Sequence, residues 1–422
     1  MIRTQQVRLR NLSKKEYCLI KQMCSYSKSL YNATLYTIRQ CYFNNNRFLP
    51  YESAYHILKS DDNYGFLLTG MAQSTMKVVD RAMKSFFALL KKRAKGLYQN
   101  PIHLPKYLKN DLFAIVCSPR AFRIKSDKLL IGFSKKFREK HKPEIKDLTF
   151  TIPKNIRGKE IREVRIIPMY NGLYFNLEYV YEEKPIEVPL NQSEYLSIDL
   201  GLDNFVTFVE SQTGSAVILD GKELKATNQW YNKENARLQS IKDKQKIKEI
   251  TRRQFRLLSR HANKINEGLN QAVNLLIKTC INKKIGNIVI GEWANIKQGI
   301  NIGKRNNQNF VQIPYHKFKQ KLKAKCELYG INYIEVDEAY TSKIDALVFE
   351  PIHKQNSYLG KRVKRGLFQS STGTMINADV NGALNILRKQ VSDDSLVQEI
   401  ISRGLVNRPE RIRLYPNKLL SN

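Results

Sequence analysis

Apolar and polar positions alternate at the start of the chain and then follow a helical period. Ile2, Val7 and Leu9 stand among polar residues over positions 2–10, a pattern typical of a β-strand. Residues 14–95 are helical in period, most clearly from Met71 to Lys91. The apolar stripe of this helix consists of Met76, Val79, Met83, Phe86 and Leu90, and its polar face of Gln73, Lys77, Arg81 and Lys84. The stripe predicts packing, whereas the polar face is either solvated or in contact with DNA.

Short β-rich runs replace this pattern from Pro101 to about Pro189. Clusters of Pro, Gly, Asn and Lys separate runs such as LLIGF, LTFTI and LYFNLEYVY. These runs predict a small antiparallel barrel. If the first strand joins it, the helical block is an insertion within the barrel.

The second half of the chain mixes strands and helices. Residues 194–220 predict three successive strands, with turns at 202–204 and 212–214. A long, basic, helical stretch follows at 228–284, then the strand GNIVIGE and a helix from Tyr315 to Tyr329. The strand INYIEVD precedes a polar stretch at 340–375, and a last helix begins near Ala378. We expect the final 30 or so residues to pack loosely or not at all.

The charge of the chain changes the picture from a generic fold to a polyanion-binding protein. The net charge is +34, which destabilises a compact state by self-repulsion unless polyanions neutralise it. Nucleic acid is the expected partner, and a ribosomal or membrane-surface protein is the alternative. The six cysteines form no C-x-x-C pair, and we expect reduced, mostly buried thiols. Without an apolar signal core or membrane span, we expect a cytoplasmic protein with no membrane partner.

Three acidic residues stand at the ends of predicted elements. Asp199 ends an apolar strand, where an ionised side chain is costly unless it is compensated. Glu292 ends the apolar run Ile288–Ile290, and Asp379 stands at the start of the last helix. Each residue alone has an ordinary explanation, such as helix capping by Asp379. Together they are either three unrelated structural acids or one cluster at a sheet edge.

A carboxylate cluster needs cations, because two like charges about 4 Å apart repel by about 4 kcal/mol at an effective dielectric constant of about 20. Two Mg²⁺ ions bound to such a cluster stabilise the attacking and leaving oxygens of a phosphodiester displacement. The cluster therefore predicts hydrolysis of a nucleic-acid backbone with two magnesium ions. The sequence contains no Walker-type loop, G-x-S-x-G or H-E-x-x-H, and its histidines are widely spread.

Several ordered motifs resemble the TnpB proteins of insertion sequences. They are SIDLGLDNF around Asp199, IVIGEW around Glu292, GKRNNQNFVQIPY at 303–315, DEAYTSK at 337–343, GKRVKRGLF at 360–368 and INADVNGALNIL at 376–387. The resemblance is strongest over residues 194–390. It extends to the small type V CRISPR effectors in the nuclease half.

The resemblance implies a multidomain α+β fold. A β-barrel wedge domain would comprise residues 1–12 and 100–190, and a helical recognition domain would comprise residues 13–99. An RNase H-like RuvC domain would cover 191–340 and 376–390, with a helical insertion at 228–284. A target-binding insert would occupy 341–375 and a flexible tail 391–422.

The resemblance also implies the residues of the site. Asp199, Glu292 and Asp379 carry over as the catalytic, magnesium-binding triad. The face that reads a short motif beside the target would include Tyr51, Gln73 and Lys77. We also expect phosphate contacts from two basic groups: Arg252, Arg253, Arg256 and Arg260, and then Lys361, Arg362, Lys364 and Arg365.

One departure concerns zinc. Many relatives carry a four-cysteine zinc ribbon before the last acid, but residues 341–375 contain no cysteine and only His353. We therefore expect no structural zinc. The insert either orders when nucleic acid binds or is a solvated basic loop.

The resemblance, together with the acid triad, thus implies an RNA-guided, magnesium-dependent DNA endonuclease that binds a guide RNA from the transposon end and double-stranded target DNA. A monomer is favoured. The alternatives are a compact CRISPR effector, a nuclease-silent RNA-guided regulator, and a transposase that acts on element ends without a guide.

Overall fold

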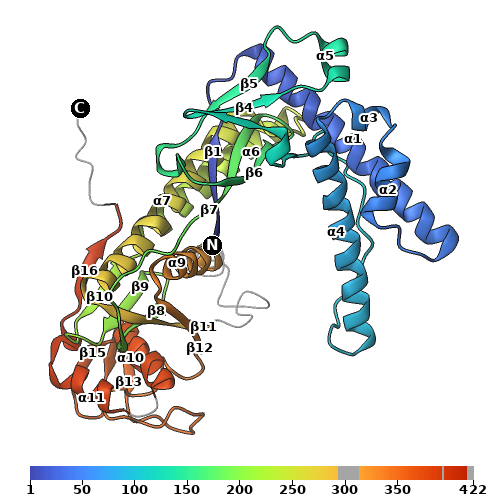
Figure 1. The fold of residues 1–422 in the computed structure, drawn as a ribbon. Helices are drawn as coiled ribbons and strands as arrows, with labels where there is room; N and C mark the ends of the chain where they lie inside the picture. The colour runs from blue at the N-terminus through green and yellow to red at the C-terminus, as the bar shows by residue number, and fades with distance from the viewer. Residues whose placement is uncertain (293–312, 392–393, 416–422) are drawn as a thin grey trace, which may run out of the picture. The chain divides into compact units, whose positions relative to one another are not determined.

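The computed structural model describes residues 1–292, 313–391 and 394–415 of a mixed α+β chain (Figure 1). It divides into two compact units, residues 1–184 and 185–422. Short 3₁₀ turns occur at Pro119–Ala121, Lys154–Ile156 and Leu405–Asn407.

The first unit begins with the strand β1 (Ile2–Arg8) and continues with helices. These are α1 (Lys14–Asn45), α2 (Tyr51–Leu58), α3 (Asp62–Gly65) and α4 (Thr69–Ala94). Helix α1 begins with a capping box in which Ser13 and Glu16 each accept a backbone hydrogen bond from the other residue. Helix α4 buries Met76, Val79 and Met83 of the predicted stripe, whereas Phe86 and Leu90 are only partly buried.

Two sheets and the short helix α5 (Lys135–His141) complete the first unit. The larger sheet has the order β1-β7-β6-β2 and contains β2 (Ile115–Cys117), β6 (Ile161–Met169) and β7 (Tyr174–Glu182). The smaller contains β3 (Arg123–Lys125), β4 (Lys128–Gly132) and β5 (Asp147–Thr151). Because β1 pairs antiparallel with β7, the first strand does join the later ones, and the helices are inserted between them in sequence. Closure of these sheets into one barrel stays a prediction.

The second unit is built on a sheet with the order β12-β11-β8-β9-β10-β16 among its described residues. Its strands are β8 (Asn191–Leu200), β9 (Asn204–Glu210), β10 (Ala216–Asp220), β11 (Ile285–Glu292), β12 (Asn332–Asp337) and β16 (Glu410–Arg413). Strands β8, β9 and β10 form the predicted antiparallel hairpin series, while β11 and β12 run parallel to β8. The carboxyl ends of β8, β11 and β12 therefore meet at one edge of the sheet.

Helices cover both faces of this sheet (Figure 1). Helices α7 (Arg252–Asn282) and α9 (Tyr315–Tyr329) pack on one face, and α10 (Ala378–Gln390) and α11 (Ser395–Ser402) pack on the other. Side chains alternate along a strand. Thus Leu196, Ile198 and Leu200 join the core with α7 and α9, whereas Asp199 lies on the α10 side.

The C-terminal segment differs from its prediction. We expected loose packing after residue 390, but α11 and β16 are part of the second unit. Strand β16 pairs parallel with β10 and forms the edge of the sheet, and Leu414 beyond it is buried in the core. The alternation of Arg411 and Arg413 with Ile412 and Leu414 is a strand pattern, and pairing also satisfies an otherwise open sheet edge.

The insert at 341–375 is structured, whereas we expected it either to order when nucleic acid binds or to be a solvated basic loop. Strands β13 (Lys361–Lys364), β14 (Leu367–Gln369) and β15 (Met375–Asn377) form a three-stranded antiparallel sheet. The amide side chains of Asn381 and Asn385 on α10 bind the backbone of Thr341, Ile344 and Ala346. The insert is thus tied to the helix that follows it.

Four of the six cysteines are buried, and all six are free thiols, as expected. None of the described helices combines the length and the apolar character that crossing a membrane requires.

Candidate active site

Asp199 lies near the end of β8, where α10 approaches the sheet closely. A Cβ atom on Gly382 of α10 would lie 2.8 Å from Oδ2 of Asp199, which is closer than real side chains allow. Glycine at this helical position therefore makes the close approach possible. The loss of water around the Asp199 carboxylate raises its pKa well above its usual value, the charges of Asp379 and Glu338 raise it further, and Arg362 opposes them.

Asp379 lies in the first turn of α10 and is not its cap. The N-cap is Asn377, whose side-chain oxygen accepts hydrogen bonds from the backbone N–H of Asp379 and Val380. The Asp379 carboxylate is thus left for other contacts. It accepts a hydrogen bond from Nδ2 of Asn204 at 2.6 Å and lies 3.6 Å from the Arg362 guanidinium.

Glu292 ends β11 at the same sheet edge, but its side chain is exposed. In the parallel register Ile290 lies opposite Ile198, so the register continues with Gly291 opposite Asp199. Glu292 is one residue further along β11, so its side chain leaves the sheet on the face opposite to that of Asp199. Within residues 1–292, 313–391 and 394–415, no three Asp, Glu, His or Cys side chains are placed to hold a metal ion. The structure brings Asp199 and Asp379 together and leaves Glu292 outside the pair.

A fourth acid, Glu338, was missed by the sequence analysis. It directly follows β12, just as Glu292 ends the parallel neighbouring strand β11. The same search for acids at strand ends would therefore have found it. A Cβ on Gly291 would lie 1.8 Å from Oε1 of Glu338, so this carboxyl occupies the space above Gly291. Its Oε1 is buried without a hydrogen-bond partner among the described residues. Loss of hydration raises the pKa of Glu338 to about 7, and the charge of Asp337 adds to the increase despite Lys319.

An open cleft of about 540 Å³ borders Asp379. Its wall includes Asp203, Asn204 and Asp379, and its basic residues are Lys222, Arg362, Arg365 and Arg411. Tyr315 closes the nearby turn by donating a hydrogen bond to the carbonyl of Gly201 at 2.8 Å. A cleft that places carboxylates beside guanidinium groups has the charge pattern that phosphate and its counterions require.

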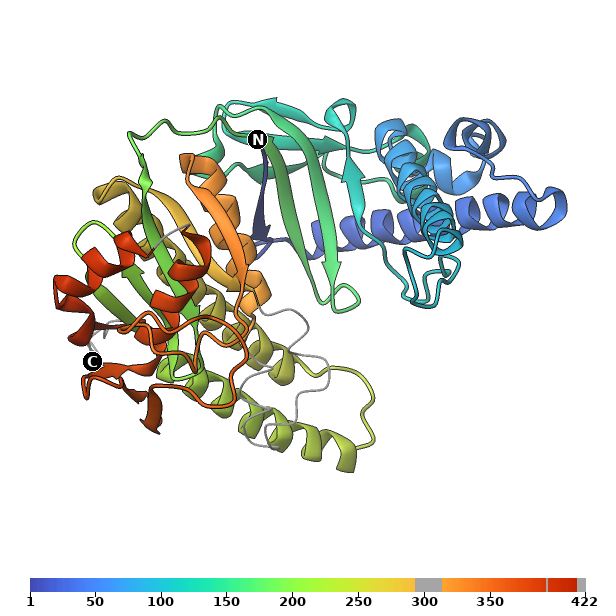
Figure 2. The same ribbon diagram turned by 90° about the horizontal axis from the view of Figure 1, so that it is seen from below.

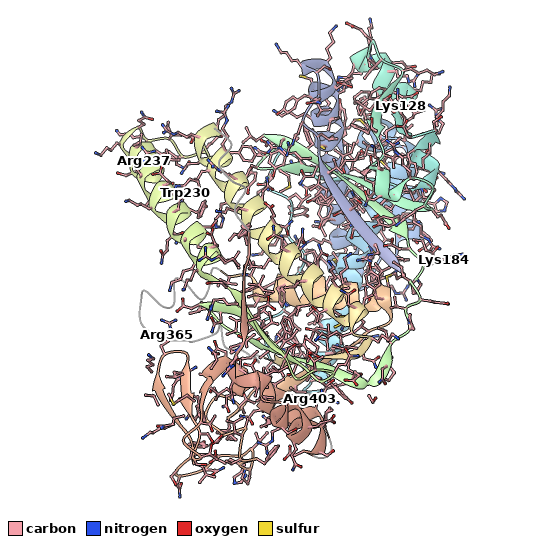
Figure 3. All side chains as sticks on the ribbon, turned by 90° about the vertical axis from the view of Figure 1, so that its left-hand side faces the viewer. Lys128, Lys184, Trp230, Arg237, Arg365 and Arg403 are labelled. Atoms are coloured by element: carbon pink, nitrogen blue, oxygen red, sulfur yellow. The ribbon has the colours of Figure 1, made fainter. Side chains whose placement is uncertain are left out.

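The basic run of the insert reaches this cleft. Lys361, Arg362, Lys364 and Arg365 are all exposed on the β13–β14 hairpin. Figure 3 shows Arg365 at the turn of that hairpin, and its guanidinium lies 2.8 Å from Oδ2 of Asp203. Two of the four predicted phosphate-binding residues, Arg362 and Arg365, are therefore paired with acids of the site in this structure.

The other predicted contacts lie on two further surfaces. Arg252, Arg253, Arg256 and Arg260 are exposed on α7. In the first unit, Tyr51 and Lys77 line a cavity of about 300 Å³, with the Lys77 ammonium 5.0 Å from the centre of the Tyr51 ring. Gln73 is partly buried near Tyr64 and does not line that cavity.

Comparisons with known proteins agree with these features. Residues 178–297 match the OrfB family of IS605 elements, described as a probable transposase, and residues 315–386 match the Cas12f1-like TNB domain. A TnpB-like protein of Acidianus two-tailed virus is 25% identical over 415 residues, which covers 88% of this chain and 83% of the viral protein. Among solved structures, a Cas12f1 protein in complex with sgRNA and target DNA aligns with a TM-score of 0.60 at 16% identity, covering 89% of this chain and 83% of that one. This last likeness shows a shared fold.

Proposed function

Because the chain belongs to the TnpB family, we propose that it is an RNA-guided, magnesium-dependent DNA endonuclease. In this proposal, base pairing with a guide RNA recognises the target sequence. The protein then recognises backbone shape, charge and a short flanking motif. Its expected partners are a guide RNA from the transposon end and double-stranded DNA.

One observation carries the proposal: Asp199 and Asp379 lie together beside a basic cleft. They come from a strand end and a helix start that are 180 residues apart in sequence, and the pKa of Asp199 is raised partly by the Asp379 charge. A structural ion pair would have the opposite effect on a carboxyl pKa. Two carboxylates that raise each other's cost of ionisation, beside the basic residues Lys222, Arg362 and Arg411, support a site for cations and phosphate.

The donor chemistry of this pair fits magnesium, which prefers oxygen ligands. Asp199 and Asp379 would hold the ions, with Glu292 as the proposed third carboxylate. When bound, two such ions supply charge stabilisation for the attacking and leaving oxygens of the phosphodiester. Asn204 orients the Asp379 carboxylate through its 2.6 Å hydrogen bond. Arg362 and Arg365 would transfer from Asp379 and Asp203 to the phosphates of the DNA backbone.

The same proposal gives each remaining surface a role in binding or cutting nucleic acid. The second unit's sheet, with β11 and β12 parallel to the first strand of a hairpin series, supports an RNase H-like nuclease domain. The first unit would supply the wedge strands and the recognition helices. Tyr51, Gln73 and Lys77 would read the flanking motif, and the arginines of α7 would hold nucleic-acid phosphates.

The test is cleavage by the complex purified with its own RNA. That RNA is sequenced, and DNA matching its variable end is offered with and without magnesium. Cutting should require magnesium and should be abolished by Asp199→Ala, while RNA binding is retained. The matched control is Glu327→Ala, which removes an exposed acid from α9 of the same unit and should cut normally.

Each alternative has its own result. Full cutting by the Asp199→Ala variant would overturn the site. Tight RNA-guided DNA binding without cutting by the unaltered chain would establish a nuclease-silent regulator. Activity that survives removal of all RNA would establish a guide-independent transposase. The genomic neighbourhood of the RNA would distinguish a transposon enzyme from a CRISPR effector.

A further inference from the structure

The long helices α6 (Lys222–Lys244) and α7 form an antiparallel pair (Figure 2). Gln254 donates a hydrogen bond to Gln239 at 3.0 Å, and the ring of His261 is 2.7 Å from the side-chain oxygen of Asn228. Residues later in α7 therefore contact residues earlier in α6, which is the pattern of an antiparallel pair. The Tyr231 and His261 rings stack between the helices, with their centres 4.1 Å apart.

A cavity of about 290 Å³ opens between these two helices. It is lined by Ala226, Thr227 and Trp230 of α6 and by Arg260, His261 and Lys264 of α7. Figure 3 shows Trp230 and Arg237 on α6. Trp230 is 43% exposed, although burying an indole ring is strongly favourable.

The charged groups beside the ring are both cations. The Arg260 guanidinium lies 5.5 Å from the centre of the Trp230 ring, within the range of a cation–π contact. Lys264, the second charged residue of the lining, lies 3.8 Å from the exposed carboxylate of Glu223 and would exchange that contact for a phosphate. An aromatic surface with an arginine plane and a lysine is the combination that binds an unstacked base together with its phosphate.

One polar side chain in the wall of the cavity and its neighbour in sequence each have an atom without a hydrogen-bond partner among the described residues. Thr227 is 5% exposed and Asn228, next to it, is 1% exposed. Neither Oγ1 of Thr227 nor Nδ2 of Asn228 has a hydrogen-bond partner among the described residues. Buried polar atoms are normally hydrogen-bonded, because an unmade bond costs about 1 to 3 kcal/mol. Because Thr227 lines the cavity, rotation of its side chain would offer the hydroxyl to the polar edge of a ligand.

We propose that this cavity binds an unpaired nucleobase of a bound nucleic acid. The base stacks on Trp230 and Arg260, Lys264 contacts the adjoining phosphate, and the polar edge of the base faces Thr227. The proposal rests on the proposed function only for the class of ligand, which is nucleic acid. It adds a site that recognises a single-stranded base rather than backbone charge.

The test measures the fluorescence of Trp230, since stacking on a base quenches an indole. The only other tryptophan is Trp293, so the protein carries Trp293→Phe, and Asp199→Ala with magnesium omitted prevents cutting. The probes are a short single-stranded RNA, DNA of the same sequence, an abasic strand of the same length and a blunt duplex. We expect quenching by single strands that have bases and none by the abasic strand or the duplex. Quenching by RNA alone would assign the base to the guide, and quenching by DNA alone would assign it to the displaced strand.

Affinity gives a second, independent measure. Trp230→Ala should weaken single-strand binding by about 5-fold to 100-fold, the range of losses seen for one stacked base, without changing the slope of affinity against salt. Trp230→Phe should recover most of that loss. Ile241→Ala is the matched control, because Ile241 is an apolar residue of the same helix with 41% exposure. It should bind normally.

The outcomes separate this proposal from the proposed function. Labelled single strands that bind by anisotropy without base-dependent quenching would overturn the cavity assignment alone. Equal affinities for the Trp230→Ala and Ile241→Ala variants would do the same. A chain that binds none of the probes would overturn the cavity assignment, whereas the proposed function stands or falls on magnesium-dependent cutting with the copurified RNA.

Discussion

Two carboxylates of the second unit have opposite pKa shifts, and their neighbours explain why. Burial raises the pKa of Asp199, and the charges of Asp379 and Glu338 raise it further. Glu210, whose side chain is fully buried, accepts hydrogen bonds from Lys283, Thr213 and Ser215. Burial alone would raise its pKa, but these donors outweigh it and hold the pKa at about 2. The neighbours of Glu210 thus stabilise its ionised form, whereas the surroundings of Asp199 disfavour ionisation.

The ion pair between Glu210 and Lys283 predicts that the stability of the fold decreases in acid. The folded-state Glu210 pKa of about 2 lies below its usual 4.5, so its stabilisation is complete above pH 4.5 and is lost as the pH falls toward 2. At pH 3 this one group should have lost about 2 kcal/mol of unfolding free energy. Urea unfolding at pH 6 and pH 3 should show a smaller difference for Glu210→Gln than for the unaltered chain. Equal differences would contradict the assignment.

At the scale of elements, buried carboxylates hold the 341–375 insert together. Asp345, fully buried, accepts hydrogen bonds from the N–H of Leu347 at 3.1 Å, the hydroxyl of Ser370 at 2.7 Å and the N–H of Ser371 at 2.8 Å. Glu350 accepts from the N–H of Asp345 and of Leu359. These bonds join the two ends of the insert, which gives a cysteine-free segment a defined structure.

Asp345→Ala should therefore loosen the insert. Several buried donors lose a charged acceptor, so we expect a destabilisation of about 2 to 4 kcal/mol. Hydrogen exchange should accelerate over residues 345–371, and a metal chelator should have no such effect on the unaltered chain. Asn356→Ala, an exposed change within the same insert, is the control. Unchanged protection in the Asp345→Ala variant would mean that these bonds do not hold the insert.

At the scale of the whole molecule, the net charge of +34 determines how the protein interacts with nucleic acid. Exposed arginines occur on α7 and on the β13–β14 hairpin of the second unit, and Lys77 and Arg81 are exposed on α4 of the first. Neutralising so many cations with phosphates releases counterions from the nucleic acid, which makes binding depend on salt.

Affinity for the copurified RNA should accordingly fall linearly with salt on logarithmic axes. Arg256→Ala should reduce the magnitude of this slope by about 1, because one phosphate contact is lost. Lys15→Ala is the control, since Lys15 already pairs with Glu144 at 2.6 Å. A binding constant independent of salt would contradict a phosphate-based interface, and equal slopes for both variants would exclude Arg256 from it.

The sequence alone was sufficient for most elements of the second unit. The predicted helix from Tyr315 to Tyr329 has those bounds, and the runs around Asp199 and before Glu292 form strands. These patterns are local, because apolar residues at the period of a strand or helix determine which face is buried. The edge strand β16 was missed because alternating arginines made its short apolar pattern look like a solvated tail.

The sequence by itself established that acids stand at the ends of strands and at a helix start. It also established the net charge and the lack of zinc ligands in the insert. Only the tertiary structure decided which acids meet. The close packing of α10 on β8 put Asp199 beside Asp379. The alternation of side chains along β11 left Glu292 on the other face, and Glu338 lies over Gly291. The tertiary structure also decided that Asp345 binds backbone groups distant in sequence and that Trp230 borders a cavity. Such contacts depend on how elements pack across the fold, and no spacing within one segment encodes them.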